Sequence, residues 1–233
     1  MTIVYAGTAL VVAYLLGAIP FGLVIVRRIS GQDVRSVGSG RTGGTNVMRA
    51  AGFGAGLLTA LLDILKGAGA VWLARTLTGG NHWIEALAGV MAVLGHNYSI
   101  FLAERVTDAA GRTRLRFHGG AGGAPSVGGA IGLWVWSVAV ILPLGAVVLF
   151  GIGYASVATM SVGLVATLVF AVRAAYFGGP WAYVLYGLLT FVLQVWALRP
   201  NIARLMNGTE RMIGWRAKRR EAKLAADSNS HSK

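Results

Sequence analysis

The stretch GSGRTGGTNVMRAAG, residues 38–52, joins two long apolar segments and is the most informative part of the chain. Its five glycines allow backbone N–H groups to converge on an oxyanion, and its hydroxyl and amide side chains add donors. Arg41 and Arg49 add charge in a form that suits bidentate contacts with phosphate. A helix is predicted from about residue 47, with Asn46 as its cap and an N-terminus that favours anions. The stretch predicts a phosphate-binding loop; a flexible connection with orienting arginines is the alternative.

The segments on both sides of this loop have the composition of an integral membrane protein. The 233 residues are 55% hydrophobic and only 12% charged, whereas a typical soluble domain has about 25% charged residues. Several apolar segments approach or exceed the ~20 residues that a membrane-spanning helix needs. They cover residues 3–26, 51–74, 84–103, 127–152, 154–172 and 180–198. The first has neither a basic region before it nor a small-residue cleavage site, so we expect a retained helix rather than a signal peptide.

Lysine and arginine indicate how these segments are oriented. The net charge is +13, and basic residues gather in residues 27–49, in residues 104–126 and in the tail from Arg199. Because basic residues beside membrane spans stay on the cytoplasmic side, we expect these three regions in the cytoplasm and the N-terminus outside. The same distribution suits anionic headgroups, so membrane lipids, and no nucleic acid, are the expected partners.

The number of spans must agree with this orientation. Six full spans would return the basic tail to the outside, so an odd number of crossings is required. Residues 127–152 contain Pro143, and proline breaks or kinks a helix, so we expect two short helices joined near Pro143 and residues 153–156 on the cytoplasmic side. The predicted fold is an all-α polytopic membrane protein with about seven transmembrane or partly spanning helices and glycine-rich cytoplasmic loops. It forms one domain over residues 1–212, followed by a basic, disordered cytoplasmic tail over residues 213–233.

Three ionisable residues within the apolar segments are candidates for a functional site. Asp63 and Lys66 share one face of a predicted helix, and buried charges in a membrane are costly enough to indicate function; a self-neutralising packing pair is the alternative. His96 comes late in its segment, near the cytoplasmic face, and is a candidate general base by residue type alone. No residues have the spacing of metal ligands or of a Ser-His-Asp nucleophile, and cysteine is absent, so we expect neither a metal nor a covalent intermediate.

Six motifs together resemble the bacterial acyl-phosphate-dependent glycerol-3-phosphate acyltransferases, the PlsY family. In chain order they are GSGRTGGTNVMRAAG, LDILKG, GHNYSIF, GGAGGAPSVGG, YASVAT and NIARLMNGTE. The resemblance covers about residues 5–212. It implies an inner-membrane bacterial enzyme that moves a fatty acyl chain from acyl-phosphate to the 1-hydroxyl of sn-glycerol 3-phosphate. The implied products are lysophosphatidic acid and phosphate, for phospholipid synthesis, with no cofactor and with a monomer as the favoured state.

The resemblance also implies where the site lies. Ser39 and Arg49 match the family's glycerol-phosphate contacts and, with His96, are the candidate catalytic residues. Matches to the glycine-rich motifs and to other polar positions indicate the remaining substrate- and phosphate-binding residues. These are Gly38, Gly40, Arg41, Gly44, Thr45, Asn46, Lys66, Gly119, Gly120, Gly122, Ser156 and Asn201.

The chain departs from the family's pattern at four positions. Arg41 stands in place of asparagine, Ala121 in place of lysine, Gly153 in place of a basic residue and Leu198 in place of histidine. Either Arg41 and other arginines replace the missing cations, or the chain is a non-catalytic relative that binds a phosphorylated lipid or metabolite.

Two further alternatives stay open. A transporter of an anionic solute would also explain charges inside the membrane. For the acyltransferase, the proton of the acceptor hydroxyl could pass to His96 or to the donor's own phosphate, and the resemblance favours the phosphate.

Overall fold

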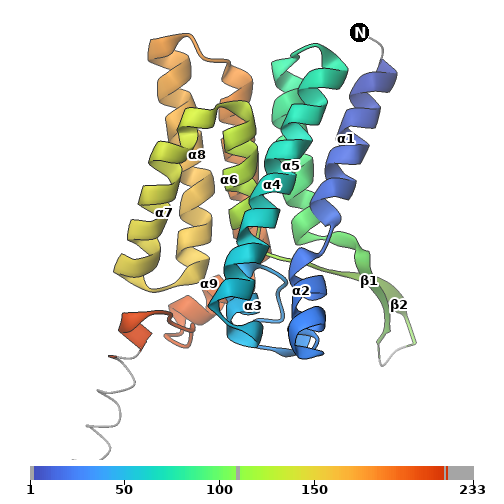
Figure 1. Cartoon of the computed structure of the whole chain (residues 1–233), viewed down its shortest axis with the longest axis vertical. Helices are drawn as coiled ribbons and strands as arrows, with labels where there is room; N and C mark the ends of the chain where they lie inside the picture. Colours follow the sequence, from blue (N-terminus) through green and yellow to red (C-terminus); the bar gives the residue numbers. More distant parts are fainter. Residues whose placement is uncertain (1–2, 109–110, 218, 220–233) are drawn as a thin grey trace, which may run out of the picture.

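The computed structural model describes residues 3–108, 111–217 and 219, which form a bundle of helices with a β-hairpin at one end (Figure 1). The helices are α1 (Ile3–Ala18), α2 (Phe21–Ser30), α3 (Gly44–Ala51), α4 (Phe53–Thr78), α5 (His82–Asn97), α6 (Gly123–Leu133), α7 (Val138–Ile152), α8 (Ala155–Phe177) and α9 (Trp181–Met206). Short 3-10 turns cover Val34–Ser36 and Val135–Ser137, and the antiparallel hairpin pairs β1 (Ser99–Thr107) with β2 (Thr113–His118). The predicted helical architecture is confirmed.

Five helical segments of the described residues are long and apolar enough to cross a membrane. They are Ile3–Ser30, Phe53–Thr78, Val135–Ile152, Ala155–Phe177 and Trp181–Met206. Helix α6 has 11 residues, so at ~1.5 Å per residue it covers about half of a ~30 Å hydrocarbon core. It packs against α4, α5 and α8, which shield it. Seven crossings therefore stay a prediction, since α5 and α6 fall short of a full apolar span.

Small residues fill the bundle interior, and large apolar residues face outward. One cluster of the core consists of alanines from α1, α4 and α5, among them Ala13, Ala74 and Ala92. A Cβ atom on Gly128 of α6 would lie 1.9 Å from the carbonyl oxygen of Ile64 on α4, so the two backbones touch. Such contacts are typical of helices packed in a membrane, where small residues let backbones approach. The exposed large side chains include Leu65, Leu168, Val172, Leu188, Val192 and Trp196.

The first apolar segment, predicted as one helix over 3–26, is broken in two. Helix α1 ends at Ala18, and α2 begins after Pro20, which has no N–H to continue the helical ladder. The break leaves the carbonyl of Ile19 without a helical partner, and it accepts a hydrogen bond from Lys66 Nζ at 2.9 Å. The break thus brings the end of α1 against a charged residue of α4.

The predicted break near Pro143 is wrong in its position. Helix α6 ends at Leu133, the chain turns at the extended Trp134, and α7 runs without interruption through Pro143. Pro143 is the sixth residue of α7, so it removes one hydrogen bond close to the helix N-terminus rather than one in the middle of a span. The guanidinium of Arg173 lies over the Trp134 ring, 4.9 Å from its centre. The α7–α8 junction still reaches the end of the bundle that carries the glycine-rich loops (Figure 1).

Candidate active site

A cavity of about 650 Å³ lies at the end of the bundle opposite the N-terminus. Its wall comes from the loop before α3, from α3 and α4, from the N-terminal ends of α6 and α8, from the C-terminal parts of α5, α7 and α9, and from the segment after α9. This volume is within the usual range for small-molecule sites. Eleven of the fifteen residues predicted for the site line the cavity, so the motifs that are distant in sequence do converge. The four that do not are Gly40, Lys66, Gly119 and Gly120.

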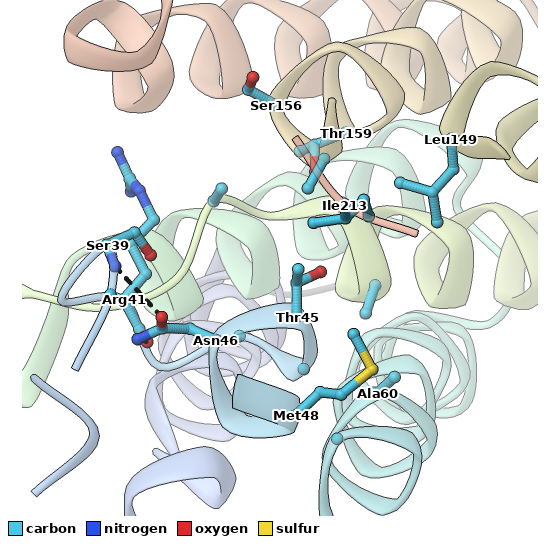
Figure 2. A pocket seen from close by; sticks show the side chains of 18 of the residues that line it. Ser39, Arg41, Thr45, Asn46, Met48, Ala60, Leu149, Ser156, Thr159 and Ile213 are labelled. Atoms are coloured by element: carbon cyan, nitrogen blue, oxygen red, sulfur yellow. Dashed lines mark hydrogen bonds between the residues drawn. The ribbon is translucent and has the colours of Figure 1, made fainter. Parts of the chain in front are cut away.

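The side chain of Asn46 holds the first glycine-rich loop in shape. Its Oδ1 atom accepts a hydrogen bond from the Ser39 amide at 3.1 Å (Figure 2). Its Nδ2 atom donates to three loop carbonyls, those of Val34, Val37 and Arg41, at 3.1, 2.9 and 2.9 Å. The prediction that Asn46 caps the helix is wrong, because Gly43 is the N-cap and Asn46 is the third residue of α3.

The N-terminus of α3 opens into the cavity. Gly44 and Thr45, its first two residues, line the cavity wall. The first N–H groups of a helix have no intrahelical acceptor and carry a partial positive charge. This end of the cavity is therefore suited to an anionic group, as the loop chemistry predicted.

Arg41 crosses from the first loop to two other parts of the wall. Its Nη1 atom donates to the Gly120 carbonyl at 2.8 Å, and its Nη2 atom donates to the carbonyl of Ala197 in α9. Burial lowers the pKa of Arg41, but arginine's ordinary value is so high that the guanidinium stays charged. The second glycine-rich loop, residues 119–123, has another bond to the first loop, because the Thr42 amide donates to the Gly119 carbonyl at 3.2 Å. Gly119 and Gly120 therefore lie behind the cavity wall as backbone acceptors.

Arg49 and Arg211 line the cavity, and neither has a hydrogen-bond or ion-pair partner within the described ranges. Burial lowers the pKa of Arg49, and so does the like charge of Arg211, as expected for two neighbouring cations that repel each other, while Glu210 acts in the opposite direction. With Arg41 and Arg204, four arginines line the cavity against two carboxylates, Glu210 and Asp63, and Asp63 is paired with Lys66 behind the wall. An anion bound here would relieve that repulsion.

Glu210 organises the tail side of the cavity. It is 7% exposed and accepts hydrogen bonds from Ser156 Oγ at 3.1 Å, Asn201 Nδ2 at 2.8 Å and Arg204 Nε at 2.9 Å. Ser156 and Asn201 thus line the cavity as predicted, but the Ser156 hydroxyl and the Asn201 amide donate to Glu210. The importance of Glu210 and Arg211 was missed; the one available signal was the place of Glu210 at the end of the NIARLMNGTE motif, directly before Arg211.

The first residues of the predicted tail belong to the wall as well. Ile213 and Gly214 line the cavity, and the Ile213 amide donates to the Gly153 carbonyl at 2.9 Å, which joins the tail to the α7–α8 junction. Residues 218 and 220–233 of the predicted tail lie outside the described residues.

Asp63, Lys66 and His96 form a buried group where α4 meets α5. Lys66 Nζ lies 2.8 Å from Asp63 Oδ1 and 3.0 Å from His96 Nδ1. Neither Asp63 oxygen accepts a well-aligned hydrogen bond from the described part of the chain, so this contact is an ion pair by distance rather than by directed bonding. Asp63 and His96 line the cavity, whereas Lys66 lies behind them.

The position of the His96 proton depends on two neighbours, because Nδ1 lies 3.0 Å from Lys66 Nζ and 3.6 Å from Asp63 Oδ1. With Lys66 as an ammonium group, the shorter contact favours the form that is protonated on Nε2. An ammonium group has only donors, so Lys66 makes Nδ1 of His96 an acceptor. An imidazole that accepts at Nδ1 carries its proton on Nε2. The Nε2 edge packs on Gly120, where an added Cβ atom would lie 1.9 Å from Nε2. His96 lines the cavity, with this edge of its ring against the backbone of Gly120.

The remaining wall of the cavity is apolar. Met48 and Ala60 face Leu149, Thr159 and Ile213 across it (Figure 2). Other lining side chains, Phe53, Leu57 and Phe150, are 71%, 49% and 59% exposed and so extend the apolar wall to the outer surface of the bundle. The cavity can accommodate a molecule with an anionic group at one end and an apolar chain at the other.

An outer surface of large apolar side chains around a helical bundle, with a basic and partly apolar cavity at one end, defines a polytopic integral membrane protein. Within that class, the chain matches the glycerol-3-phosphate acyltransferase family over residues 7–208 and belongs to it. It is 40% identical over 217 residues to the glycerol-3-phosphate acyltransferase of one strain of Thermus thermophilus, covering 91% of this chain and 96% of the relative. The enzyme of the same name from Rubrobacter xylanophilus is 40% identical over 204 residues, covering 88% of this chain and 93% of the relative.

Two solved structures have the same fold. One is the crystal structure of PlsY (YgiH), an integral membrane glycerol 3-phosphate acyltransferase, in its glycerol 3-phosphate form. It superposes with a TM-score of 0.71 and 32% identity, over 90% of this chain and 96% of that chain. The lysophosphatidic acid form of PlsY gives a TM-score of 0.70, 31% identity and coverage of 90% and 95%. The resemblance drawn from the six motifs is confirmed.

Proposed function

We propose that the protein transfers a fatty acyl chain from acyl-phosphate to the 1-hydroxyl of sn-glycerol 3-phosphate and releases lysophosphatidic acid and phosphate. The observation that carries the proposal is one cavity that combines four arginines with an apolar wall. Both substrates carry a phosphate, and the donor also carries a fatty chain. Structures of its relative PlsY were solved in glycerol 3-phosphate and lysophosphatidic acid forms, which supports the acceptor and the product.

The acceptor's phosphate is assigned to Arg49 and Ser39. Arg49 has all its donors free for a ligand within the described part of the chain, and an unpaired arginine suits a bidentate phosphate contact. Arg211, beside it, adds a second guanidinium. Asn201 and Ser156 are assigned an indirect role. They donate hydrogen bonds to Glu210, and Glu210 in turn accepts a hydrogen bond from Arg204 and so positions it.

The donor is assigned to the N-terminus of α3 and the apolar wall. The N–H groups at Gly44 and Thr45 face the donor's phosphate, and the fatty chain runs between Met48 and Leu149 toward the outer surface. This arrangement places the acyl carbonyl between the two phosphate subsites. Holding both substrates in contact supplies much of the rate enhancement that such a reaction requires.

In the transfer itself, the acceptor oxygen bonds to the acyl carbon, and the bond from that carbon to the phosphate oxygen breaks with its electron pair. The hydroxyl proton passes to the departing phosphate, because His96 is occupied at Nδ1 by Lys66 and already carries a proton on Nε2. His96 donates from Nε2 to the oxyanion that develops on the donor. Asp63 and Lys66 act on the reaction through His96 as positioning residues.

The test is an assay of the purified protein in lipid with acyl-phosphate and labelled glycerol 3-phosphate. We expect labelled lysophosphatidic acid with an equal amount of phosphate. Arg49→Ala should lower turnover by at least 10-fold, since a charge-assisted hydrogen bond contributes about 1.5–3 kcal/mol. Arg28→Ala, an exposed arginine of α2 outside the cavity, is the matched control and should keep full activity.

The other readings predict different outcomes. Glycerol 3-phosphate that binds without product formation would identify a non-catalytic relative. Uptake of glycerol 3-phosphate into sealed vesicles without acyl transfer would identify a transporter. Product formation that is equal in Arg49→Ala and wild type would keep the reaction but overturn the assignment of the acceptor site.

The proposed setting is a bacterial inner membrane, with the cavity and the C-terminus on the cytoplasmic side and the N-terminus outside. The basic residues of the loop before α3, of the hairpin and of the tail support this orientation. The chain has no cysteine, so single cysteines at residue 3 and residue 111 can be labelled from either side of intact cells. Residue 3 should react with an impermeant reagent from outside and residue 111 only after the cells are opened.

A further inference from the structure

The β-hairpin is an extended feature that the proposed reaction does not use. We propose that it lies in the headgroup layer of an anionic bilayer, with Leu115 and Phe117 turned toward the lipid chains and its arginines on the lipid phosphates. The inference is independent of the acyl-transfer reaction. It rests on the alternation of residue types along the strands, on the exposure of their side chains, and on where the hairpin joins the bundle.

The second strand alternates basic and apolar residues. In Arg114-Leu115-Arg116-Phe117, successive side chains of a strand point to opposite faces, so the two arginines share one face and the two apolar residues the other. Leu115 pairs directly with Arg105 of β1, which therefore lies on the apolar face. Leu115 is 61% exposed and Phe117 is 38% exposed, although both are large apolar side chains. The hairpin is amphipathic, and the described residues leave its apolar face uncovered.

The charges of the hairpin are available to an external anion. Of its acids, Glu104 is held by His118 at 2.5 Å, which lowers the pKa of Glu104, and Asp108 is paired with Arg112 at 3.1 Å. Arg105, Arg114 and Arg116 have neither a hydrogen-bond nor an ion-pair partner in the parts of the chain that the structure covers. Arg105 and Arg114 are therefore free for phosphate groups of lipids, whereas Arg116 lies opposite Glu104 on the neighbouring strand and interacts with that carboxylate as well.

The base of the hairpin is continuous with the lipid-facing surface of the bundle. Strand β1 packs against the ends of α1 and α5, and its first exposed residues, Ile100 and Phe101, are apolar. Leu102 anchors the strand in a core that it shares with Leu23 and Val47 of α2 and α3. The hairpin thus leaves the bundle at the cavity end (Figure 1), with the exposed Ile100 and Phe101 at its base. A basic and apolar surface in that position matches an anionic membrane surface in both charge and polarity.

The experiment uses the full chain, which has no cysteine to remove. Leu115→Cys is labelled with an environment-sensitive fluorophore in vesicles of phosphatidylcholine with or without phosphatidylglycerol. Arg114→Cys, one residue earlier on the opposite face, is the matched control. Lipids with a nitroxide on the upper acyl chain, and iodide in the water, serve as quenchers. Both residues are exposed, so both variants should melt at the wild-type temperature in detergent.

We expect the label at residue 115 to be quenched by the nitroxide lipid and protected from iodide, and the label at residue 114 to show the reverse. Combining Leu115→Cys with Arg105→Gln, Arg114→Gln and Arg116→Gln should weaken the dependence on phosphatidylglycerol, by roughly fivefold per arginine that contacts the surface. Iodide quenching that is equal at both positions would overturn the proposal and leave the hairpin as a face for a soluble partner. Lipid quenching that ignores phosphatidylglycerol would overturn the anionic part of it.

Discussion

At the residue scale, the departures from the family's pattern converge on Arg41. Its two terminal nitrogens donate to the carbonyls of Gly120 and Ala197, the residues just before Ala121 and Leu198. Ala121 and Leu198, where the family's pattern has lysine and histidine, both line the cavity next to this guanidinium. The guanidinium of Arg41 therefore lies between positions 121 and 198. A basic side chain at either position could bring its charge to the same part of the cavity. These departures are better explained as an exchange of charge positions than as independent losses.

This explanation predicts the behaviour of a pair of substitutions. Arg41→Ala should lower kcat/KM by about 10–100-fold, because it removes a charge-assisted contact that contributes about 1.5–3 kcal/mol. Adding Ala121→Lys to that variant should recover part of the loss, since a lysine at 121 can bring an ammonium to the same part of the cavity. Ala121→Leu in the Arg41→Ala background controls for size. If the lysine and leucine variants are equally inactive while both remain folded, the exchange of charge is refuted.

A second prediction at this scale concerns His96. Because Lys66 makes Nδ1 an acceptor, His96 acts as an Nε2 donor, and glutamine can supply an N–H donor in a similar place. His96→Gln should therefore keep more turnover than His96→Ala, and the dependence of kcat on pH should keep its shape. A general base would behave otherwise: both variants would lose most of kcat, and the acid limb of the profile would disappear. The measurement is kcat from pH 5 to 9 for the wild type and both variants, a range that brackets the ordinary histidine pKa of about 6.5.

At the scale of the helices, close backbone contacts define the bundle. Gly128 of α6 lies on the carbonyl of Ile64 in α4, whereas a Cβ atom on Gly69, also in α4, would meet nothing within 4 Å. Gly128→Ala should force the two helices apart and lower the stability by about 1–3 kcal/mol, the usual cost of overpacking. Gly69→Ala is the matched control and should be neutral or slightly stabilising, because alanine favours a helix more than glycine does. Thermal unfolding in detergent would measure both, and equal melting temperatures would contradict the packing argument.

The helices also show how far sequence patterns can predict this fold. The long apolar segments were found because a span is a local property of about 20 consecutive residues. The positions of the helix breaks were not predicted correctly, because the effect of a proline depends on what the backbone groups beside it can contact. Pro20 ends a helix where Lys66 donates a hydrogen bond to the freed carbonyl of Ile19, whereas Pro143 is carried within α7. The hairpin was missed as well, although the alternation in TRLRFH, residues 113–118, is a usable signal for a strand.

The same distinction holds for the site. Glycine and arginine in the first loop could be read as a phosphate site because the chemistry is contained within one short stretch. The role of Asn46 could not be predicted from the sequence, because three of its hydrogen-bond partners are backbone carbonyls that only the folded loop brings to it. Glu210 is held by Asn201 from its own motif and by Ser156 of α8, and only the tertiary structure brings Ser156 to it.

At the scale of the whole molecule, the hairpin connects the membrane surface to the cavity. Strand β1 begins two residues after Asn97, at the end of the helix that carries His96, and β2 leads from His118 into Gly119 and Gly120. The Gly120 amide donates to the carbonyl of His96 at 2.9 Å, and Arg41 holds the Gly120 carbonyl. Both ends of the hairpin are therefore bonded to the wall of the site, and a shift of the hairpin would move the second glycine-rich loop.

If the hairpin rests on anionic lipid, turnover should depend on the lipid as well as on the substrates. We expect kcat in vesicles to rise with the phosphatidylglycerol content and to fall when salt screens the surface. The variant with Arg105→Gln, Arg114→Gln and Arg116→Gln should show a flatter response, while its activity in detergent stays at the wild-type level because these side chains are outside the cavity. The comparison of vesicles with detergent separates a lipid effect from damage to the site. A response to phosphatidylglycerol that is unchanged in this variant would show that the lipid acts elsewhere, on substrate delivery or on the arginines of the cavity itself.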